Sequence, residues 1–143
     1  MKNKESLIDD LMRQAVIVKH WQSDVAFFQD EIYFLATLMD TYLKWLMIDE
    51  NIGRTRVVAS QVAKTGNECK LLDQQLRRHL EAISSAIKER SPEADKELMQ
   101  EQERLESVFT KYVKEFREIK KEVFSLTERV MESEKNPLLL ERS

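Results

Sequence analysis

The sequence has few of the residues that end helices and form turns, with two glycines and two prolines among 143 residues. A sheet protein needs a turn after every short strand, so this scarcity excludes most all-β folds. Hydrophobic residues make up 42% of the chain, which is too large a share for a disordered protein. The composition therefore predicts an all-α fold made of a few long helices.

Cysteine is almost absent as well. Cys69 is the only one, which excludes an intrachain disulfide and a zinc site made of cysteines. A single thiol is typical of proteins from reducing compartments. The N-terminal segment lacks the apolar core of a signal peptide, and no apolar run approaches the roughly 18 residues that span a bilayer. We therefore expect a cytoplasmic protein with no membrane partner.

A basic excess, the usual mark of a nucleic-acid binder, is also missing, because the net charge is −3. One basic run follows residue 110, and glutamates alternate with it at salt-bridge spacings. The cations are Lys111, Lys114, Arg117, Lys120 and Lys121, and the glutamates are Glu115, Glu118 and Glu122. We interpret this run as a solvated helix face and expect no nucleic-acid partner.

Apolar residues at alternating spacings of four and three predict a first helix over about residues 4–50. Gln14 is the one polar residue that interrupts the series. Asn51 and Gly53 favour left-handed backbone and should end this helix. The series is Leu7, Leu11, Val18, Trp21, Val25, Phe28, Ile32, Leu35, Met39, Tyr42 and Leu46.

A second helix is predicted over about residues 55–90, with smaller and more polar residues in its series. Gly66 lies in the middle, but the repeat stays in phase from Val62 to Cys69. A continuous helix is therefore favoured over a break at Gly66. The series is Val58, Val62, Thr65, Cys69, Leu72, Leu76, His79, Ile83 and Ala86.

A third helix is predicted over about residues 92–135. Ser91-Pro92-Glu93 supplies a cap, a fixed φ and a negative charge for its first turn. Asn136 precedes Pro137, so the helix should end before it and leave a tail at 136–143. The series is Leu98, Gln102, Leu105, Phe109, Tyr112, Phe116, Ile119, Val123, Leu126 and Val130.

Three long helices joined by tight turns predict an elongated up-down-up three-helix bundle with coiled-coil-like heptad packing, in a single domain 1–143. The stretch 32–48 is too apolar for this fold, because its apolar arc covers roughly 220° of the helix surface. We expect a second copy of the chain to cover the excess and form a homodimer. The expected interaction residues are Phe34, Leu38, Leu43, Trp45 and Met47. The alternatives are cover by the tail at Leu138–Leu140 or simple exposure.

The two histidines could meet in one layer of the bundle. If the first turn is at Asn51–Gly53, paired positions on the first two helices sum to about 103, which sets Asp24 level with His79. His20 lies one turn before Asp24, and Gln102 or Glu106 on the third helix should reach His79. Two imidazoles and a carboxylate could bind a divalent metal. The favoured interpretation is a hydrogen-bonded polar layer that fixes helix register.

Asp24 and Glu31 lie among aromatic residues on the first helix, where a carboxylate should be paired or protonated. By their levels in the bundle, the expected partners are Lys70, Arg77 and Lys114. Neither histidine follows a glutamate by three residues, so the di-iron pattern of ferritin-like bundles is absent.

Motifs of catalysis are missing from the sequence. It contains no glycine-rich phosphate loop, no G-x-S-x-G and no H-E-x-x-H. Long helices with tight turns also leave few loops for a catalytic cleft. We therefore expect no enzyme activity, no catalytic residue and no cofactor, and a role in protein–protein interaction.

One stretch of the first helix combines aromatic and acidic residues, namely Trp21, Val25, Phe28, Asp30, Glu31 and Phe34. This pattern resembles that of small bacterial helical-bundle proteins of unknown function. The resemblance implies a helical bundle and brings no assigned activity and no catalytic residue.

Overall fold

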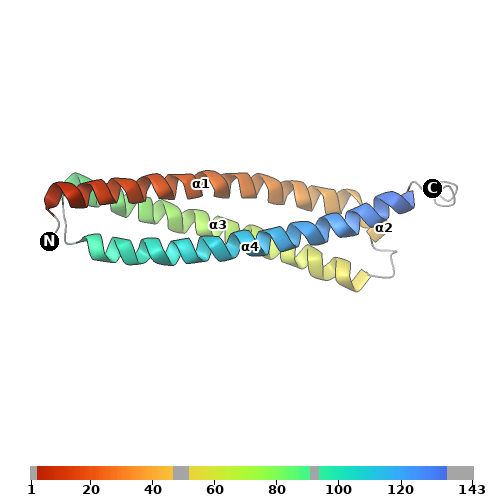
Figure 1. The fold of residues 1–143 in the computed structure, drawn as a ribbon. Coiled ribbons are helices and arrows are strands. Elements are labelled where there is room, and N and C mark those ends of the chain that lie inside the picture. The colour runs from red at the N-terminus through yellow and green to blue at the C-terminus, as the bar shows by residue number, and fades with distance from the viewer. Residues whose placement is uncertain (1–2, 47–51, 91–93, 135–143) are drawn as a thin grey trace. The chain divides into compact units, whose positions relative to one another are not determined.

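The computed structural model describes residues 3–46, 52–90 and 94–134. These residues form three long helices, α1 (Lys4–Thr41), α3 (Ile52–Glu89) and α4 (Asp95–Glu134), and one short helix, α2 (Leu43–Leu46) (Figure 1). No strand occurs within the described ranges. The predicted all-α three-helix bundle is confirmed. Among the described helices, none is long and apolar enough to cross a membrane.

The helices contribute to two compact units. Unit 1 contains Met1–Gln29 and Glu68–Val113, and unit 2 contains Asp30–Asn67 and Lys114–Ser143. Each unit therefore holds one segment of each long helix. That the whole chain acts as one domain remains a prediction.

Contacts in unit 1 establish the directions of its helices. Trp21 stacks on Phe109, with ring centroids 5.7 Å apart, and Phe28 contacts Tyr112 further along both helices. Residue numbers thus rise together on α1 and α4, which run parallel. α3 runs antiparallel to α4. His79 contacts Gln102, whereas Cys69, which comes earlier on α3, contacts Tyr112, which comes later on α4. The up-down-up order is therefore present in unit 1.

The predicted apolar series form the core. All nine series residues of α3 are buried, including Thr65 and His79. On α1, Gln14 is buried at the position where it interrupts the series, and four series residues are only half-buried, namely Leu7, Trp21, Phe28 and Ile32. On α4, every series residue is buried except Phe109 and Ile119, which are half-buried. Period and burial agree because a helix returns the same face to its neighbours every three or four residues.

The first predicted helix is interrupted near its C-terminal end. α1 ends at Thr41, a turn follows at Tyr42, and α2 begins at Leu43. The backbone N–H of Trp45 donates to the Tyr42 carbonyl rather than to the carbonyl of residue 41. Near the break, the Thr41 hydroxyl donates to the Thr37 carbonyl at 2.8 Å, a bond that tends to bend helices. The predicted continuous helix is therefore wrong at Tyr42, where it is interrupted, whereas residues 43–46 are helical as predicted and residues 47–50 lie outside the described part of the chain.

The helix ends show further local causes. Asn3 caps α1, because its Oδ1 accepts a hydrogen bond of 2.8 Å from the backbone N–H of Ser6. After α3, Arg90 takes a left-handed φ of 51°. The predicted stop at Asn51, start at Ser91-Pro92-Glu93 and tail at 136–143 lie outside the described residues. The expected left-handed turn at Gly53 is wrong, because Gly53 lies in the first turn of α3 and has no positive φ.

α3 passes through Gly66 without a break, as predicted. A Cβ at this position would lie 3.4 Å from Cγ2 of Ile32, so α1 approaches α3 closely here within unit 2. A methyl group would fit at this distance, so the glycine costs helix propensity of about 1 kcal/mol relative to alanine without being required by the approach.

Candidate functional site

A polar layer crosses the core of unit 1. It consists of Gln14 on α1, His79 on α3 and Gln102 on α4, each no more than 5% exposed. Nε2 of His79 lies 2.6 Å from Oε1 of Gln102, and Nε2 of Gln102 donates to the Gln14 backbone carbonyl at 3.3 Å. The predicted meeting of His79 with Gln102 is confirmed.

These contacts fix the tautomer of the histidine. A backbone carbonyl only accepts, so the amide nitrogen of Gln102 must face Gln14 and its oxygen must face His79. That oxygen also only accepts, so Nε2 of His79 must carry a proton. In the neutral imidazole, Nδ1 is therefore a bare acceptor.

The layer is incompletely satisfied. Nδ1 of His79 and both amide atoms of Gln14 are buried and have no hydrogen-bond partner among the described residues. A buried polar atom without a partner costs roughly 1–3 kcal/mol. The layer therefore pairs specific residues of the three helices but leaves Nδ1 of His79 without a hydrogen-bond donor.

His20 and Asp24 do not belong to this layer. Both side chains are exposed, so the predicted grouping of His20, Asp24 and His79 is wrong. The reason is the register between α1 and α3. The Cys69 thiol donates to the Val25 carbonyl at 3.6 Å, so paired residue numbers sum to 94 rather than 103. Relative to the predicted pairing, this register is shifted by nine residues, which is more than two turns, and Gln14 takes the place of Asp24.

A metal site does not form from these residues. The part of the chain that the structure describes holds no group of three His, Cys, Asp or Glu side chains able to bind a metal ion. The polar layer fits the favoured interpretation of a hydrogen-bonded layer.

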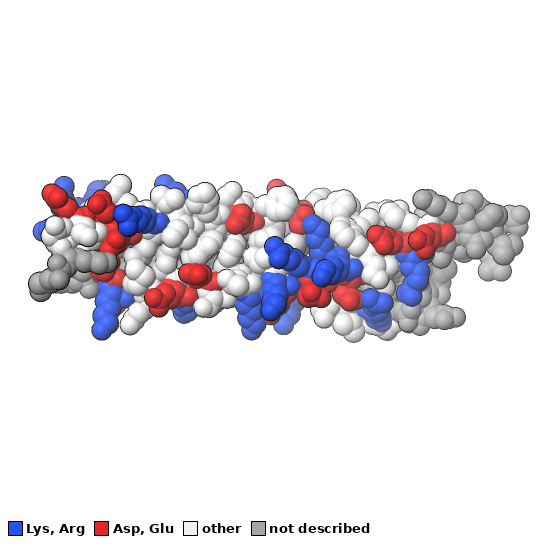
Figure 2. All heavy atoms as spheres, in the orientation of Figure 1, with Lys and Arg blue, Asp and Glu red and all other residues white. Residues whose placement is uncertain are grey.

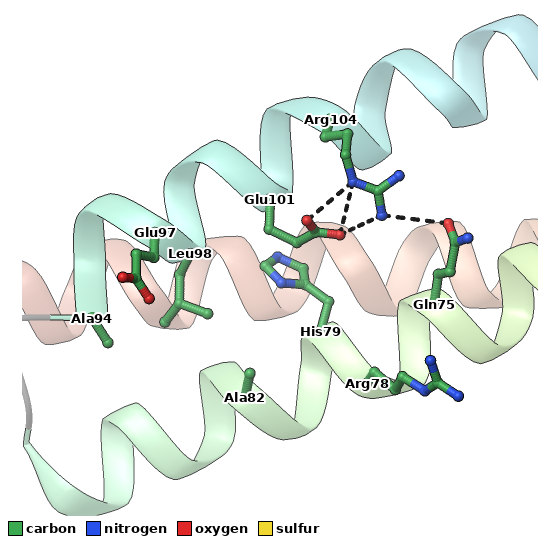
Figure 3. Close-up of a pocket in the computed structure, with 9 residues that line it drawn as sticks. All are labelled: Gln75, Arg78, His79, Ala82, Ala94, Glu97, Leu98, Glu101 and Arg104. Atoms are coloured by element: carbon green, nitrogen blue, oxygen red, sulfur yellow. Dashed lines mark hydrogen bonds and ion pairs between the residues drawn. The ribbon is translucent and has the colours of Figure 1, made fainter.

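A pocket of about 570 Å³ lies between α3 and α4 of unit 1, next to the polar layer (Figure 3). His79 and Leu98 form its buried part, and charged side chains stand around its rim. The lining residues are Gln75, Arg78, His79, Ala82, Ala94, Glu97, Leu98, Glu101 and Arg104. The volume lies within the range of small-molecule sites.

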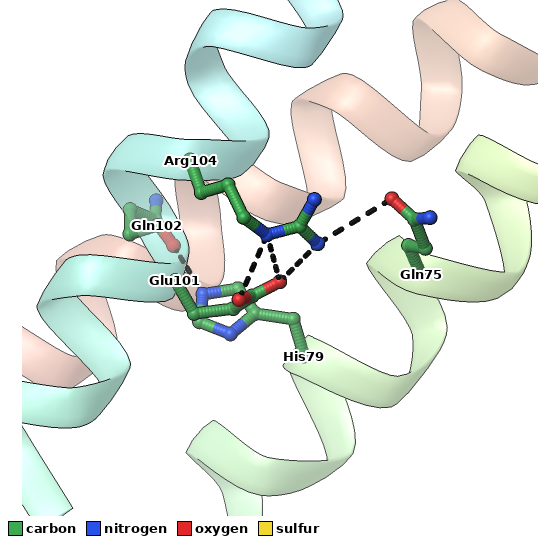
Figure 4. Close-up of polar contacts among 5 residues, drawn as sticks. All are labelled: Gln75, His79, Glu101, Gln102 and Arg104. Carbon is green, nitrogen blue, oxygen red and sulfur yellow. Dashed lines mark hydrogen bonds and ion pairs between the residues drawn. The ribbon is translucent and has the colours of Figure 1, made fainter.

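The charges at the rim are partly paired. The Arg104 guanidinium donates to both carboxylate oxygens of Glu101 and contacts the amide oxygen of Gln75 at 3.5 Å (Figure 4). Hydrogen bonding from Arg104 lowers the pKa of Glu101, so this carboxyl is ionised at neutral pH. The same pairing raises the pKa of Arg104.

Cys69 and Tyr112 form a second buried polar contact in unit 1. Burial raises the pKa of the Cys69 thiol, although its hydrogen bond with Tyr112 acts in the opposite direction. Burial also raises the pKa of the Tyr112 hydroxyl. Both groups are therefore neutral at physiological pH, and the thiol is a poor nucleophile.

The predicted interaction residues lie in unit 2. Phe34 is 55% exposed, whereas Leu38 and Trp45 are half-buried. Met47 and the side chain of Leu43 lie outside the described part of the chain. Sequence analysis missed Tyr33, which is 76% exposed. Its place on the helix wheel, away from the apolar series, is the signal that could have found it.

Ion pairs of unit 2 involve the basic run of α4. Lys120 donates to Glu31 at 2.8 Å, and Lys121 lies 3.6 Å from Glu118. Arg54 of α3 pairs with Glu122. Figure 2 shows Lys and Arg mixed with Asp and Glu on the face that it draws. The predicted pairing of Glu31 is thus confirmed, but the expected partners are wrong, because the register places Lys120 beside it.

Comparison with family models, with curated proteins and with solved structures gives no match. The resemblance of the Trp21–Phe34 pattern to small bacterial bundles therefore remains a prediction.

Proposed function

We propose that this chain is a non-enzymatic, cytoplasmic helical-bundle protein that acts through protein–protein contacts, and that it forms a homodimer through unit 2. The observation that supports this proposal is the exposure of a large aromatic side chain, Phe34, at 55%. Leu38 lies one turn further on the same helix face and is half-buried. Exposed apolar patches of this kind often mark protein-interaction sites.

A second copy of the chain is the favoured occupant, because a two-fold contact needs only one self-complementary surface. Phe34 and Leu38 would form the centre of this contact, where truncating an aromatic residue usually costs most. Exposed charges such as Asp30 would remain at its rim.

The mass of the full chain in solution tests the proposal. We expect sedimentation equilibrium at micromolar to submillimolar concentrations to give twice the chain mass. Phe34→Glu should shift the equilibrium to monomer, because the new charge would be buried in the interface without a partner. Its side chain is exposed in a single chain, so far-UV circular dichroism should stay unchanged.

Ala36→Glu is the matched control. Ala36 is exposed on the same helix but faces away from Phe34, and the variant adds the same charge. A monomeric wild-type chain would contradict the proposal, and so would equal dissociation by both variants.

The second candidate function is binding of a small ligand by unit 1. The sequence suggested a metal or small ligand held by His20, Asp24 and His79, but the exposure of the first two leaves His79 alone. The observation that favours a ligand is the unpaired, buried Nδ1 of His79 in the lining of a pocket.

A further inference from the structure

Hydrogen-bond acceptors from both α3 and α4 line the pocket in unit 1. Glu97 and Glu101 are four residues apart on α4, so their carboxylates lie on the same face of the helix. Figure 3 shows the His79 ring next to Glu101, with Leu98 drawn between the ring and Glu97. Nδ1 of this ring is an acceptor, because Nε2 carries the proton donated to Gln102.

The donors present in the pocket do not satisfy these acceptors. Arg104 is engaged with Glu101 and Gln75. Figure 3 shows the Arg78 guanidinium directed away from Glu97. Within the described residues, Glu97 has no ion-pair partner and Nδ1 of His79 has no hydrogen-bond donor. A ligand that fits must therefore supply both positive charge and N–H groups.

The remaining walls of the pocket are apolar. Leu98, Ala82 and Ala94 lie between the charged groups and offer contact to a short alkyl chain. Leu98 is only 8% exposed and contributes to the buried part of the pocket. A bare metal ion does not suit this arrangement, because no three ligating side chains of the described residues come close enough together.

We propose that this pocket binds a primary ammonium group carried on a short alkyl chain. The ammonium donates to the Glu97 carboxylate and to Nδ1 of His79, and the alkyl chain packs on Leu98 and Ala82. Nδ1 is enclosed, so binding also displaces side chains at the pocket floor. The inference rests on the second candidate function and is independent of self-association, which uses unit 2.

Binding at Nδ1 would extend an existing chain of hydrogen bonds. The ligand would donate to His79, His79 donates to Gln102, and Gln102 donates to the Gln14 carbonyl. Each bond polarises the next in a low-dielectric core, so the ligand should strengthen the contacts among all three helices of unit 1.

Nuclear magnetic resonance of the full chain tests the proposal. The probes are butylammonium chloride, the lysine side chain of Nα-acetyl-lysine methylamide, and tetramethylammonium chloride as a cation without N–H groups. The imidazole ¹⁵N signal of His79 Nδ1 is the readout, because it moves when this atom accepts a hydrogen bond. We expect saturable shifts with both primary ammonium probes and none with tetramethylammonium.

Glu97→Gln should weaken butylammonium binding about tenfold, because it removes the charge from one of the two acceptors. Glu103→Gln is the matched control, since Glu103 is exposed on the same helix but does not line the pocket. Both substituted residues are exposed, so neither variant should affect folding.

Stronger binding of the lysine probe would indicate that the natural ligand is a lysine side chain of a protein partner. Stronger binding of butylammonium would indicate that it is a free amine. Either result supports the proposal. The absence of a saturable shift with both primary ammonium probes overturns it. An equal response to tetramethylammonium also overturns it, because hydrogen bonding would then play no part. Sedimentation mass is measured separately, so failure here leaves the homodimer proposal intact.

Discussion

His79 on α3 and Gln102 on α4 meet in the core of unit 1, with Nε2 and Oε1 2.6 Å apart. Their positions in the heptad series would normally carry apolar residues. The series residues before and after Gln102 are Leu98 and Leu105, neither of which can accept a hydrogen bond from the imidazole. A slip of one helix turn would therefore leave the buried Nε2–H without an acceptor, so this pair favours a single register.

Removing one partner of this pair should be costly. Gln102→Leu leaves the Nε2–H of His79 buried without an acceptor, and we expect a loss of about 1–3 kcal/mol in the free energy of unfolding. The double variant His79→Leu/Gln102→Leu should recover most of that loss, because the imidazole N–H and its acceptor are then removed together. Urea denaturation followed by circular dichroism measures both. Equal stability of Gln102→Leu and wild type would contradict the proposed role of the pair.

Filling Gly66 should stabilise unit 2. Gly66→Ala gains helix propensity of about 1 kcal/mol, and its new Cβ would make an ordinary van der Waals contact with Cγ2 of Ile32 at 3.4 Å. We expect a net gain of about 0.5–1 kcal/mol in thermal or urea denaturation. Gly53→Ala is the control, because a Cβ there meets nothing within 4 Å and lies in the first turn of α3. A Gly66→Ala variant less stable than wild type would contradict this prediction.

The Cys69 thiol should be unreactive in the folded chain. Burial raises its pKa above the usual 9.0, so little thiolate forms at neutral pH. We expect alkylation by iodoacetamide to be slow and to accelerate only when denaturant unfolds the chain. Reaction of the native chain at the rate of free cysteine would contradict this burial.

The same shift predicts a pH dependence of stability. A raised pKa in the folded state means that the protonated thiol contributes stability below pH 9.0, and that this contribution is lost as the pH rises through the folded value. Cys69→Ala should therefore flatten the loss of stability at alkaline pH. An unchanged alkaline profile in that variant would assign the loss to other groups.

The Lys120–Glu31 pair should couple α1 to α4 in unit 2. Both side chains are partly buried, and Lys120 also lies 5.9 Å from the Phe124 ring centroid. A double-mutant cycle with Lys120→Met and Glu31→Gln should give a coupling energy of about 0.5–1 kcal/mol. The control is Lys121 with Glu118, whose exposed pair on one helix should give roughly half as much or less. Equal coupling energies in the two cycles would contradict the expectation that partial burial strengthens the Lys120–Glu31 pair.

The sequence by itself determined the helices and their buried faces. Spacings of four and three placed Cys69, Leu76 and His79 in the core, because this repeat returns one face of a helix to its neighbours whatever those neighbours are. It also predicted that α3 continues through Gly66, because the repeat stays in phase across the glycine.

Only the tertiary structure decided which residues share a layer. The apolar spacing runs from Met39 through Tyr42 to Leu46, so periodicity gave no sign that α1 ends at Thr41. The contacts of unit 1 place Gln14, not Asp24, at the level of the His79–Gln102 pair. Register depends on where the chain turns and on which side chains pack against each other across helices. The apolar spacing within a single helix determines neither.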